Sequence, residues 1–195
     1  MGIAPSSAII YNSRPKMLKG NVINLRPVKE GEIDLLWDKH ADIADRGPFF
    51  PIGVISQTRF RREFNETGFW EREKGMLVIV DKDDKINGHI EFFKTVNYLD
   101  ELELSYHIYG IESRGKGVAT DAVMLLTRYL FEHLKHNRIR LIIHPDNAAS
   151  RRVAEKAGYQ FEGIARGAWY NRGQNHDVAV YAALQDEFLK GLKPQ

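Results

Sequence analysis

Two segments of the chain carry residue types that suit an anionic ligand. The first, Arg114-Gly115-Lys116-Gly117-Val118-Ala119-Thr120, lies between a predicted strand and an amphipathic helix. Glycines there let backbone N–H groups approach a ligand without a Cβ, and a helix start adds unpaired donors and a positive dipole end. Such a loop suits a diphosphate, although two glycines before a helix are also common in plain strand-to-helix turns. The run matches neither the GxxxxGK[ST] nor the GxGxxG pattern.

The second segment repeats this arrangement further along the chain. Asp146-Asn147-Ala148-Ala149-Ser150 follows another apolar strand and opens a helix that leads to Glu155-Lys156-Ala157-Gly158-Tyr159. Each helix begins where a strand ends, so we expect both helix starts to open on one edge of a shared sheet. The two segments together indicate a ligand site at that edge.

The elements that must position these segments follow from hydrophobic periodicity. Glu101 to Tyr109 alternates cleanly, with one apolar face and one face that carries Glu101, Glu103, Ser105 and His107. We expect the first face in the core and the second to meet ligand or water. The predicted helices are Glu30 to His40, Val118 to a point before Asn137, and Ala148 to Ala157, the last closed by Gly158. The other predicted strands are Val22 to Leu25, Met76 to Val80, Ile86 to Phe93, Ile139 to Ile143, Phe161 to Arg166 and Asp177 to Leu184.

This order of elements predicts one mixed α/β domain over residues 20–190, after a flexible lead-in over residues 1–19. Residues 45–75 have no clear period and are expected to form short helices and loops. Met1, Gly2 and Ser6 fit a short myristoylation pattern that also arises by chance. No run of about 18 apolar residues is present, which argues against a membrane span.

Composition removes several functional classes. The 28 Lys and Arg residues exceed the 26 Asp and Glu residues by two, too few for the broad positive field of a nucleic-acid-binding protein. The chain has no cysteine, which excludes disulfides, cysteine-ligated metals and a cysteine nucleophile. We therefore expect a cytoplasmic protein without nucleic-acid or membrane partners.

Taken together, the motifs of this chain resemble those of one known family. The chain resembles the GNAT superfamily of acetyltransferases, whose acetyl-CoA motif Arg/Gln-x-x-Gly-x-Gly/Ala is met by Arg114, Gly117 and Ala119. The strand Glu103 to Ile108, the Asn147 to Ser150 segment and the closing Gly173 to Leu184 segment resemble the Rim-type branch, the ribosomal-protein N-terminal acetyltransferases. The likeness runs from about Val22 to Leu184. It implies a central, twisted, mostly antiparallel sheet, flanked by helices and splayed beside the strand at Ile139.

The resemblance also implies how acetyl-CoA binds. The main-chain N–H groups after Arg114 would hold the pyrophosphate, the strand at Tyr106 to Ile108 would pair with pantetheine, and Asn147 would bond the pantetheine arm. The full set of expected cofactor contacts is Tyr106, His107, Ile108, Arg114, Gly115, Lys116, Gly117, Val118, Ala119, Thr120, Asn147 and Ser150. Arg151, Arg152 and Lys156 are candidates for the 3′-phosphate, although charges on a short helix more often face solvent.

Acetyl transfer to an amine needs a base, donors for the oxyanion and a proton for the departing thiolate. We favour Glu103 as the base, with Glu101 and His107 as substitutes on the same strand face. Many relatives place a tyrosine seven residues after the motif's asparagine, where this chain has Ala154. Ser150 becomes the favoured acid, unless it only caps its helix. The remaining candidates for the acid are Tyr106, Tyr159 and Tyr170. This chemistry calls for no metal.

The acceptor is the least determined part. Aromatic residues between Phe49 and Trp70, with Trp169 and Tyr170, fall where this fold forms its acceptor mouth, although most such rings belong to cores. An α-amine titrates at a pKa of about 7.7 to 8.0 against about 10.4 for lysine, so it needs less help from a base. We therefore expect a protein or peptide N-terminus. The alternatives are a small amine (polyamine, amino sugar or antibiotic) and an inactive acyl-CoA sensor; a homodimer stays open.

Overall fold

The structure, a computed structural model, describes residues 17–191. Its strands are β1 (Leu18–Lys19), β2 (Asn24–Arg26), β3 (Lys74–Val80), β4 (Ile86–Phe93), β5 (Glu101–Ile108), β6 (Arg138–Ile143), β7 (Gln160–Asn171) and β8 (Gln174–Leu184). Its α-helices are α1 (Ile33–Ala41), α2 (Gln57–Thr67), α3 (Val118–His133), α4 (Ala148–Lys156) and α5 (Gln185–Gly191). Two short 3₁₀ helices, η1 (Glu30–Glu32) and η2 (Ile111–Ser113), precede α1 and α3. The predicted mixed α/β fold is confirmed.

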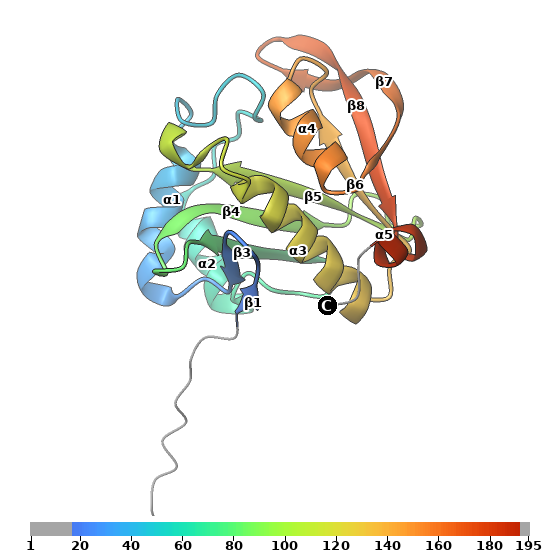
Figure 1. The fold of residues 1–195 in the computed structure, drawn as a ribbon. Helices are drawn as coiled ribbons and strands as arrows, with labels where there is room; N and C mark the ends of the chain where they lie inside the picture. Colours follow the sequence, from blue (N-terminus) through green and yellow to red (C-terminus); the bar gives the residue numbers. More distant parts are fainter. Residues whose placement is uncertain (1–16, 192–195) are drawn as a thin grey trace, which may run out of the picture.

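All eight strands form one sheet in the order β1-β2-β3-β4-β5-β6-β8-β7 (Figure 1). Neighbours are antiparallel except β5 and β6, which run parallel. These two strands pair only from Glu101 to Glu103 on β5 and from Arg138 to Arg140 on β6. Beyond those residues the strands diverge, as expected. The remainder of β5 therefore turns an edge without a strand partner toward the gap.

Helices cover both faces of the sheet. One core cluster joins the sheet to α3, α4 and α5, and the other joins it to α1 and α2 (Figure 1). β3 contributes to both, because Leu77 and Ile79 face the first cluster while Val78 and Val80 face the second. Alternate side chains of a strand point to opposite faces, so a strand buried on both sides reads as a continuous apolar run.

Several boundaries differ from the sequence expectations. Leu18 and Lys19, expected in the lead-in, pair with Leu25 and Asn24, so regular structure begins before residue 20. Part of the irregular 45–75 region is the 11-residue helix α2, whose start is capped by the Ser56 hydroxyl accepting from the Arg59 N–H at 3.2 Å. The final helix α5 was not expected. Residues 1–16, which hold the myristoylation pattern and most of the lead-in, lie outside the described residues.

Among the described residues, no helix has both the length and the apolarity that crossing a bilayer requires.

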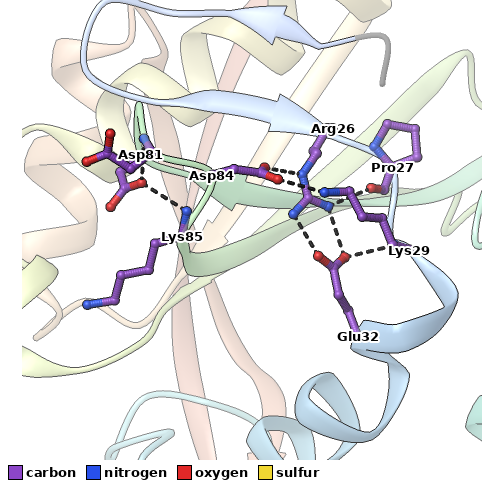
Figure 2. A network of polar contacts seen from close by, with 8 residues as sticks. Arg26, Pro27, Lys29, Glu32, Asp81, Asp84 and Lys85 are labelled. Carbon is purple, nitrogen blue, oxygen red and sulfur yellow. Dashed lines mark hydrogen bonds and ion pairs between the residues drawn. The ribbon is translucent and has the colours of Figure 1, made fainter. Parts of the chain in front are cut away.

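A closed ionic cluster fastens the β3–β4 hairpin to the start of the domain (Figure 2). Arg26 on β2 is 1% exposed and donates to both oxygens of Glu32, at 2.9 and 2.7 Å, and to Asp84 at 2.5 Å. Lys29 donates to the other oxygen of Asp84 at 2.6 Å. Each of the two cations therefore meets a carboxylate, and we call these four residues the Arg26 cluster.

Candidate active site

A cleft of about 1030 Å³ opens where β5 and β6 separate. Its walls come from β5, β6, the starts of α3 and α4, β7 and the loop at 46–51. Because β5 has no strand partner after Glu103 on this side, its backbone N–H and C=O groups there need another partner. An extended chain of amide groups, as in pantetheine, would meet that need.

The glycine loop forms the floor at one end of the cleft. Gly115 and Gly117 have φ values of +75° and +83°, a backbone conformation that glycine adopts without strain. Gly117 is the N-cap of α3, and no side chain caps that end, so the first N–H groups of the helix lack an internal acceptor. Arg114, Gly115 and residues 117–120 line the cleft, whereas Lys116 does not. The loop thus has the geometry of an anion site, with Lys116 outside it.

Asp121 in the first turn of α3 does not oppose an anion there. Its carboxylate accepts from the backbone N–H groups of Val22 at 2.7 Å and Ile23 at 3.0 Å. These bonds draw the negative charge toward the β1–β2 turn, which leaves the loop side of the helix start free for a ligand.

The second segment brings Ser150 to the same cleft. Asn147 caps α4, because its Oδ1 accepts from the Ser150 N–H at 3.1 Å. The Ser150 hydroxyl is therefore not needed as a cap, and it lies 2.8 Å from the Tyr106 hydroxyl. Asn147, Ser150 and Tyr106 all line the cleft. Burial raises the pKa of Tyr106 to about 12, so this phenol keeps its proton at neutral pH.

The other acid candidates are elsewhere. The Tyr159 hydroxyl lies 2.6 Å from Thr127 in the core, and Tyr170 is 71% exposed outside the cleft lining. Ala154 is fully buried in the core. Neither Tyr159 nor Tyr170 lines the cleft, so the structure gives no support to either residue as the acid.

Glu103 lines the cleft and is held from one side. Arg140 on β6 donates to its Oε2 at 3.1 Å, and the described hydrogen bonds of Glu103 do not use Oε1. Burial raises the pKa of Glu103, although Arg140 opposes the shift. The result is a carboxylate that is a better proton acceptor than an ordinary glutamate and has one oxygen available.

The two substitutes for Glu103 are not equivalent to it. Glu101 is 5% exposed, accepts from Arg138 at 2.9 Å and Arg140 at 2.7 Å, and does not line the cleft. It therefore acts as a buried ion-pair partner, and its expected exposure to ligand or water is wrong. His107 does line the cleft, but burial lowers its pKa to about 4 and its Nε2 lies 3.3 Å from the Asp45 carbonyl.

Of the three candidate contacts for the 3′-phosphate, two line the cleft and one does not. Arg152 and Lys156 line the cleft. Arg151 instead donates to the Tyr181 hydroxyl at 3.0 Å and to the Pro145 carbonyl at 3.4 Å, so it braces α4 against β8. Adjacent helix residues point about 100° apart, which explains how neighbours with the same charge diverge.

Fewer aromatic residues line the cleft than the sequence suggested. Within the aromatic segment only the loop at 46–51, with Phe49 and Phe50, lines the cleft, together with Trp169 of β7. Phe60 and Phe69 belong to the core under α1 and α2. Sequence reasoning missed Arg46, Arg140 and His144, which also line the cleft. The alternation of Arg138 and Arg140 on a short apolar strand was the available signal for Arg140.

Comparisons with known proteins agree with this architecture. Residues 23–160 match the family described as Acetyltransferase (GNAT) domain. The chain is 30% identical over 186 residues to a Bacillus subtilis (strain 168) protein named "Probable N-acetyltransferase YjcK", a match that covers 88% of this chain and 99% of that one.

Two solved structures share the fold. The RimL ribosomal L7/L12 α-N-protein acetyltransferase, in complex with coenzyme A, has a TM-score of 0.72 at 20% identity and covers 87% of this chain and 98% of its own. The Vibrio cholerae spermidine N-acetyltransferase, in complex with CoA and spermine, has a TM-score of 0.74 at 20% identity and covers 86% and 98%. The family match, the relative and the splayed sheet agree: this chain belongs to the GNAT family and is an N-acetyltransferase that uses acetyl-CoA.

Proposed function

We propose that this enzyme transfers acetyl from acetyl-CoA to the α-amine of a peptide or protein N-terminus. The observation that carries the proposal is the charge of the cleft. Among the described residues that line it, Glu103 is the single carboxylate, whereas the cationic side chains are Arg46, Arg114, Arg140, Arg152 and Lys156. A polyamine carries several positive charges and would need several carboxylates, so this lining disfavours it.

The acceptor's own chemistry points the same way. An α-amine has a pKa of about 7.7 to 8.0, so a sizeable fraction is neutral at pH 7, unlike a lysine amine at about 10.4. One carboxylate with a raised pKa is sufficient to remove the proton from such a group. Phe49, Phe50 and Trp169 offer the first side chains of a peptide an apolar surface.

We infer that the helix start and the open edge of β5 hold the co-substrate. The N–H groups of Gly115 to Thr120 would bind the pyrophosphate, and the β5 backbone at Tyr106 to Ile108 would pair with pantetheine. Asn147 uses Oδ1 for the cap, which leaves its N–H₂ group for the pantetheine arm. Arg152 and Lys156 would meet the 3′-phosphate. Arg151 and Lys116 have no role in this arrangement.

The reaction then uses three side chains. Glu103 takes a proton from the ammonium through Oε1, directly or through water, and the neutral amine attacks the thioester carbonyl. The new C–N bond forms, the C–S bond breaks, and the thiolate receives a proton from the Ser150 hydroxyl. Tyr106, 2.8 Å from Ser150, returns a proton to that hydroxyl. The acylated nitrogen sheds its second proton through water to the Tyr106 phenolate, and Glu103 releases the first proton to solvent. Arg140 is a positioning residue for Glu103.

This assignment agrees with the Rim-type resemblance, and relatives of both acceptor classes share the fold, as their names state. A small monoamine is the second candidate, because it also carries a single positive charge. An inactive acyl-CoA sensor is the third.

A thiol-release assay with an acceptor panel separates these alternatives. We expect short peptides with a free N-terminus to outperform spermidine and aminoglycosides, and α-amine blocking to abolish turnover even when an internal lysine remains. Faster turnover of spermidine, an aminoglycoside or the internal lysine would overturn the acceptor. Acetyl-CoA binding without turnover on any amine would favour the sensor.

The co-substrate site has its own test. Gly117→Glu places bulk and negative charge beside the uncapped helix start, so we expect acetyl-CoA binding, measured by calorimetry, to be lost. Gly68→Glu is the matched control, because Gly68 has a similar φ of +62° and no neighbour within 4 Å of an added Cβ. Unchanged affinity in Gly117→Glu would remove the pyrophosphate from this loop.

A further inference from the structure

A second group of polar side chains lies on the same face of β4 and β5 as Glu103 and His107, but outside the lining of the cleft. His89 and Glu91 alternate on one face of β4, and His40 in the last turn of α1 packs over them. One ligand atom from each of these three residues lies within 4.8 Å of the other two. We call these residues the His40 cluster. Two imidazoles and one carboxylate form a donor set typical of zinc and other divalent transition metals.

The separations match metal ligation better than hydrogen bonding. Glu91 Oε1 lies 3.5 Å from His40 Nε2 and 3.3 Å from His89 Nε2. Charge-assisted N–H···O bonds are shorter, about 2.7 to 2.9 Å. A tetrahedral site with metal–ligand bonds of about 2.0 to 2.1 Å has ligand–ligand edges of about 3.3 to 3.4 Å. The two edges that start at Glu91, 3.5 and 3.3 Å, are close to that value.

The surroundings orient the donors as in metal sites. His89 is 2% exposed, and its Nδ1 lies 2.6 Å from the Tyr109 hydroxyl. When Nδ1–H donates to that hydroxyl, the ring is fixed with the Nε2 lone pair toward Glu91. The His40 ring stacks on His89 with centroids 4.6 Å apart, and its buried Nδ1 has no hydrogen-bond partner. His40 therefore gains little from hydrogen bonding in its present position.

A small cavity gives access to the cluster. It has a volume of about 100 Å³ and is lined by His40 and Glu91 together with Glu63 and Glu71. That space is sufficient for the water that completes a three-ligand site, since one water takes about 30 Å³. Lys74 also lines the cavity and pairs with Glu63, so Glu71 is the added carboxylate that favours entry of a cation rather than an anion.

We propose that His40, His89 and Glu91 bind one divalent zinc-class ion, with water as the fourth ligand. The ion is not a reactant. It ties the end of α1 to β4, next to the loop at 46–51 that lines the cleft. Arg46 donates to the His40 carbonyl, and His89 packs edge-on against His107 of the cleft, with ring centroids 5.9 Å apart. The ion would therefore stabilise the position of the loop at 46–51, which lines the cleft.

The test uses the untagged full-length chain, stripped with a chelator and free of CoA, because thiols bind zinc. Calorimetry with Zn²⁺ should give one site, and Co²⁺ should give the visible bands of a tetrahedral complex. Zn²⁺ should also raise the melting temperature. His40→Ala and Glu91→Gln should each weaken binding by at least about tenfold, as loss of a ligand must. Glu91→Gln nearly preserves side-chain volume, and the melting temperature of the stripped variants reports their folding.

Two control variants make the outcome decisive. His133→Ala removes an exposed histidine on α3 and should bind Zn²⁺ normally. His176→Ala disrupts a second histidine pair at the cleft, where His144 Nε2 and His176 Nδ1 lie 3.3 Å apart. Zinc binding that survives in both His40→Ala and Glu91→Gln, that is lost instead in His176→Ala, or that is absent from the wild type would overturn the proposal.

Discussion

The Arg26 cluster and the Glu103 site are built from the same residue types, yet they differ in what their carboxylates can do. Both oxygens of Glu32 accept from Arg26, and each oxygen of Asp84 accepts from a different cation. Glu103 accepts from Arg140 through Oε2 and faces a cleft. A carboxylate with every oxygen paired serves stability, whereas one with a free oxygen at a cleft is available for proton transfer.

The pKa shifts follow this difference. The hydrogen bonds from Lys29 and Arg26 lower the pKa of Asp84. Burial by itself would raise the pKa of Glu32, but the bonds from Arg26 and Lys29 lower it overall. For Glu103, burial outweighs Arg140 and the pKa is raised. The same two influences thus give opposite results, because the number of donors differs.

The largest expected effect comes from opening the closed cluster. Arg26→Met should lower the free energy of unfolding by about 3 kcal/mol, because it leaves two carboxylates without their buried partner. Turnover per folded molecule should stay near wild type, since Arg26 does not line the cleft. Urea unfolding measures the first quantity. Arg128→Met, which removes an exposed pair with Glu132 on α3, is the control and should cost less than about 0.5 kcal/mol.

Glu103→Gln should do the reverse of Arg26→Met, because it should lower turnover and leave stability nearly unchanged. Turnover near neutral pH should fall by about 10²-fold while acetyl-CoA affinity and stability stay close to wild type, because the amide cannot take the proton. The loss should shrink at high pH, where the amine is already neutral. Glu162→Gln removes another carboxylate paired with an arginine, outside the cleft, and should leave turnover unchanged. A wild-type rate for Glu103→Gln would move the base elsewhere.

Changes to the proposed proton donors, Ser150 and Tyr106, should lower turnover less than the change to Glu103. Ser150→Ala should lower turnover by roughly 10-fold rather than more, because the Tyr106 phenol stays nearby as a donor. Steady-state rates with a free-amine peptide measure this, with Thr58→Ala, which removes an exposed hydroxyl on α2 outside the cleft, as the control. Tyr106→Phe combined with Ser150→Ala should lose more than either change alone. Additive effects of the two changes would contradict a shared proton path.

The smallest effect that we expect is a change of the unfolding free energy with pH. Its sign differs between the Arg26 cluster and Glu103. The folded-state pKa values of Glu32 and Asp84 are lowered, so their contribution is present above about pH 4.5 and is lost as pH falls through the folded values. The gap in unfolding free energy between wild type and Arg26→Met should narrow over that acidic range.

Glu103 should behave oppositely, because its folded pKa is raised. Its ionised form costs stability above that pKa, and the cost disappears as pH falls toward the ordinary value. Activity should fall on the same acid limb as the base gains its proton. Glu103→Gln should lose that limb and keep only the rise that follows the α-amine's own pKa of about 7.7 to 8.0. A separate limb below that of the amine that persists in Glu103→Gln would assign it to another group.

Sequence alone was sufficient for the parts that depend on local pattern. Period-two alternation located β5, three-four spacing located α3, and glycines marked the loop at Gly115 to Gly117 and the end of α4 at Gly158. These signals are readable because backbone geometry and side-chain direction repeat over a few residues. The family came from a resemblance carried by the motifs at Arg114, Asn147 and Gly173, and the splayed sheet was what that resemblance implied.

Tertiary structure alone decided which side chains meet. Glu101 and Glu103 share one strand face, yet parallel pairing with β6 locks the first between two arginines and leaves the second at the cleft. Tyr106 reaches Ser150 across the splay, and His40 reaches His89 and Glu91 from another layer. Such contacts depend on strand register and helix placement between residues distant in sequence, and no local periodicity encodes either.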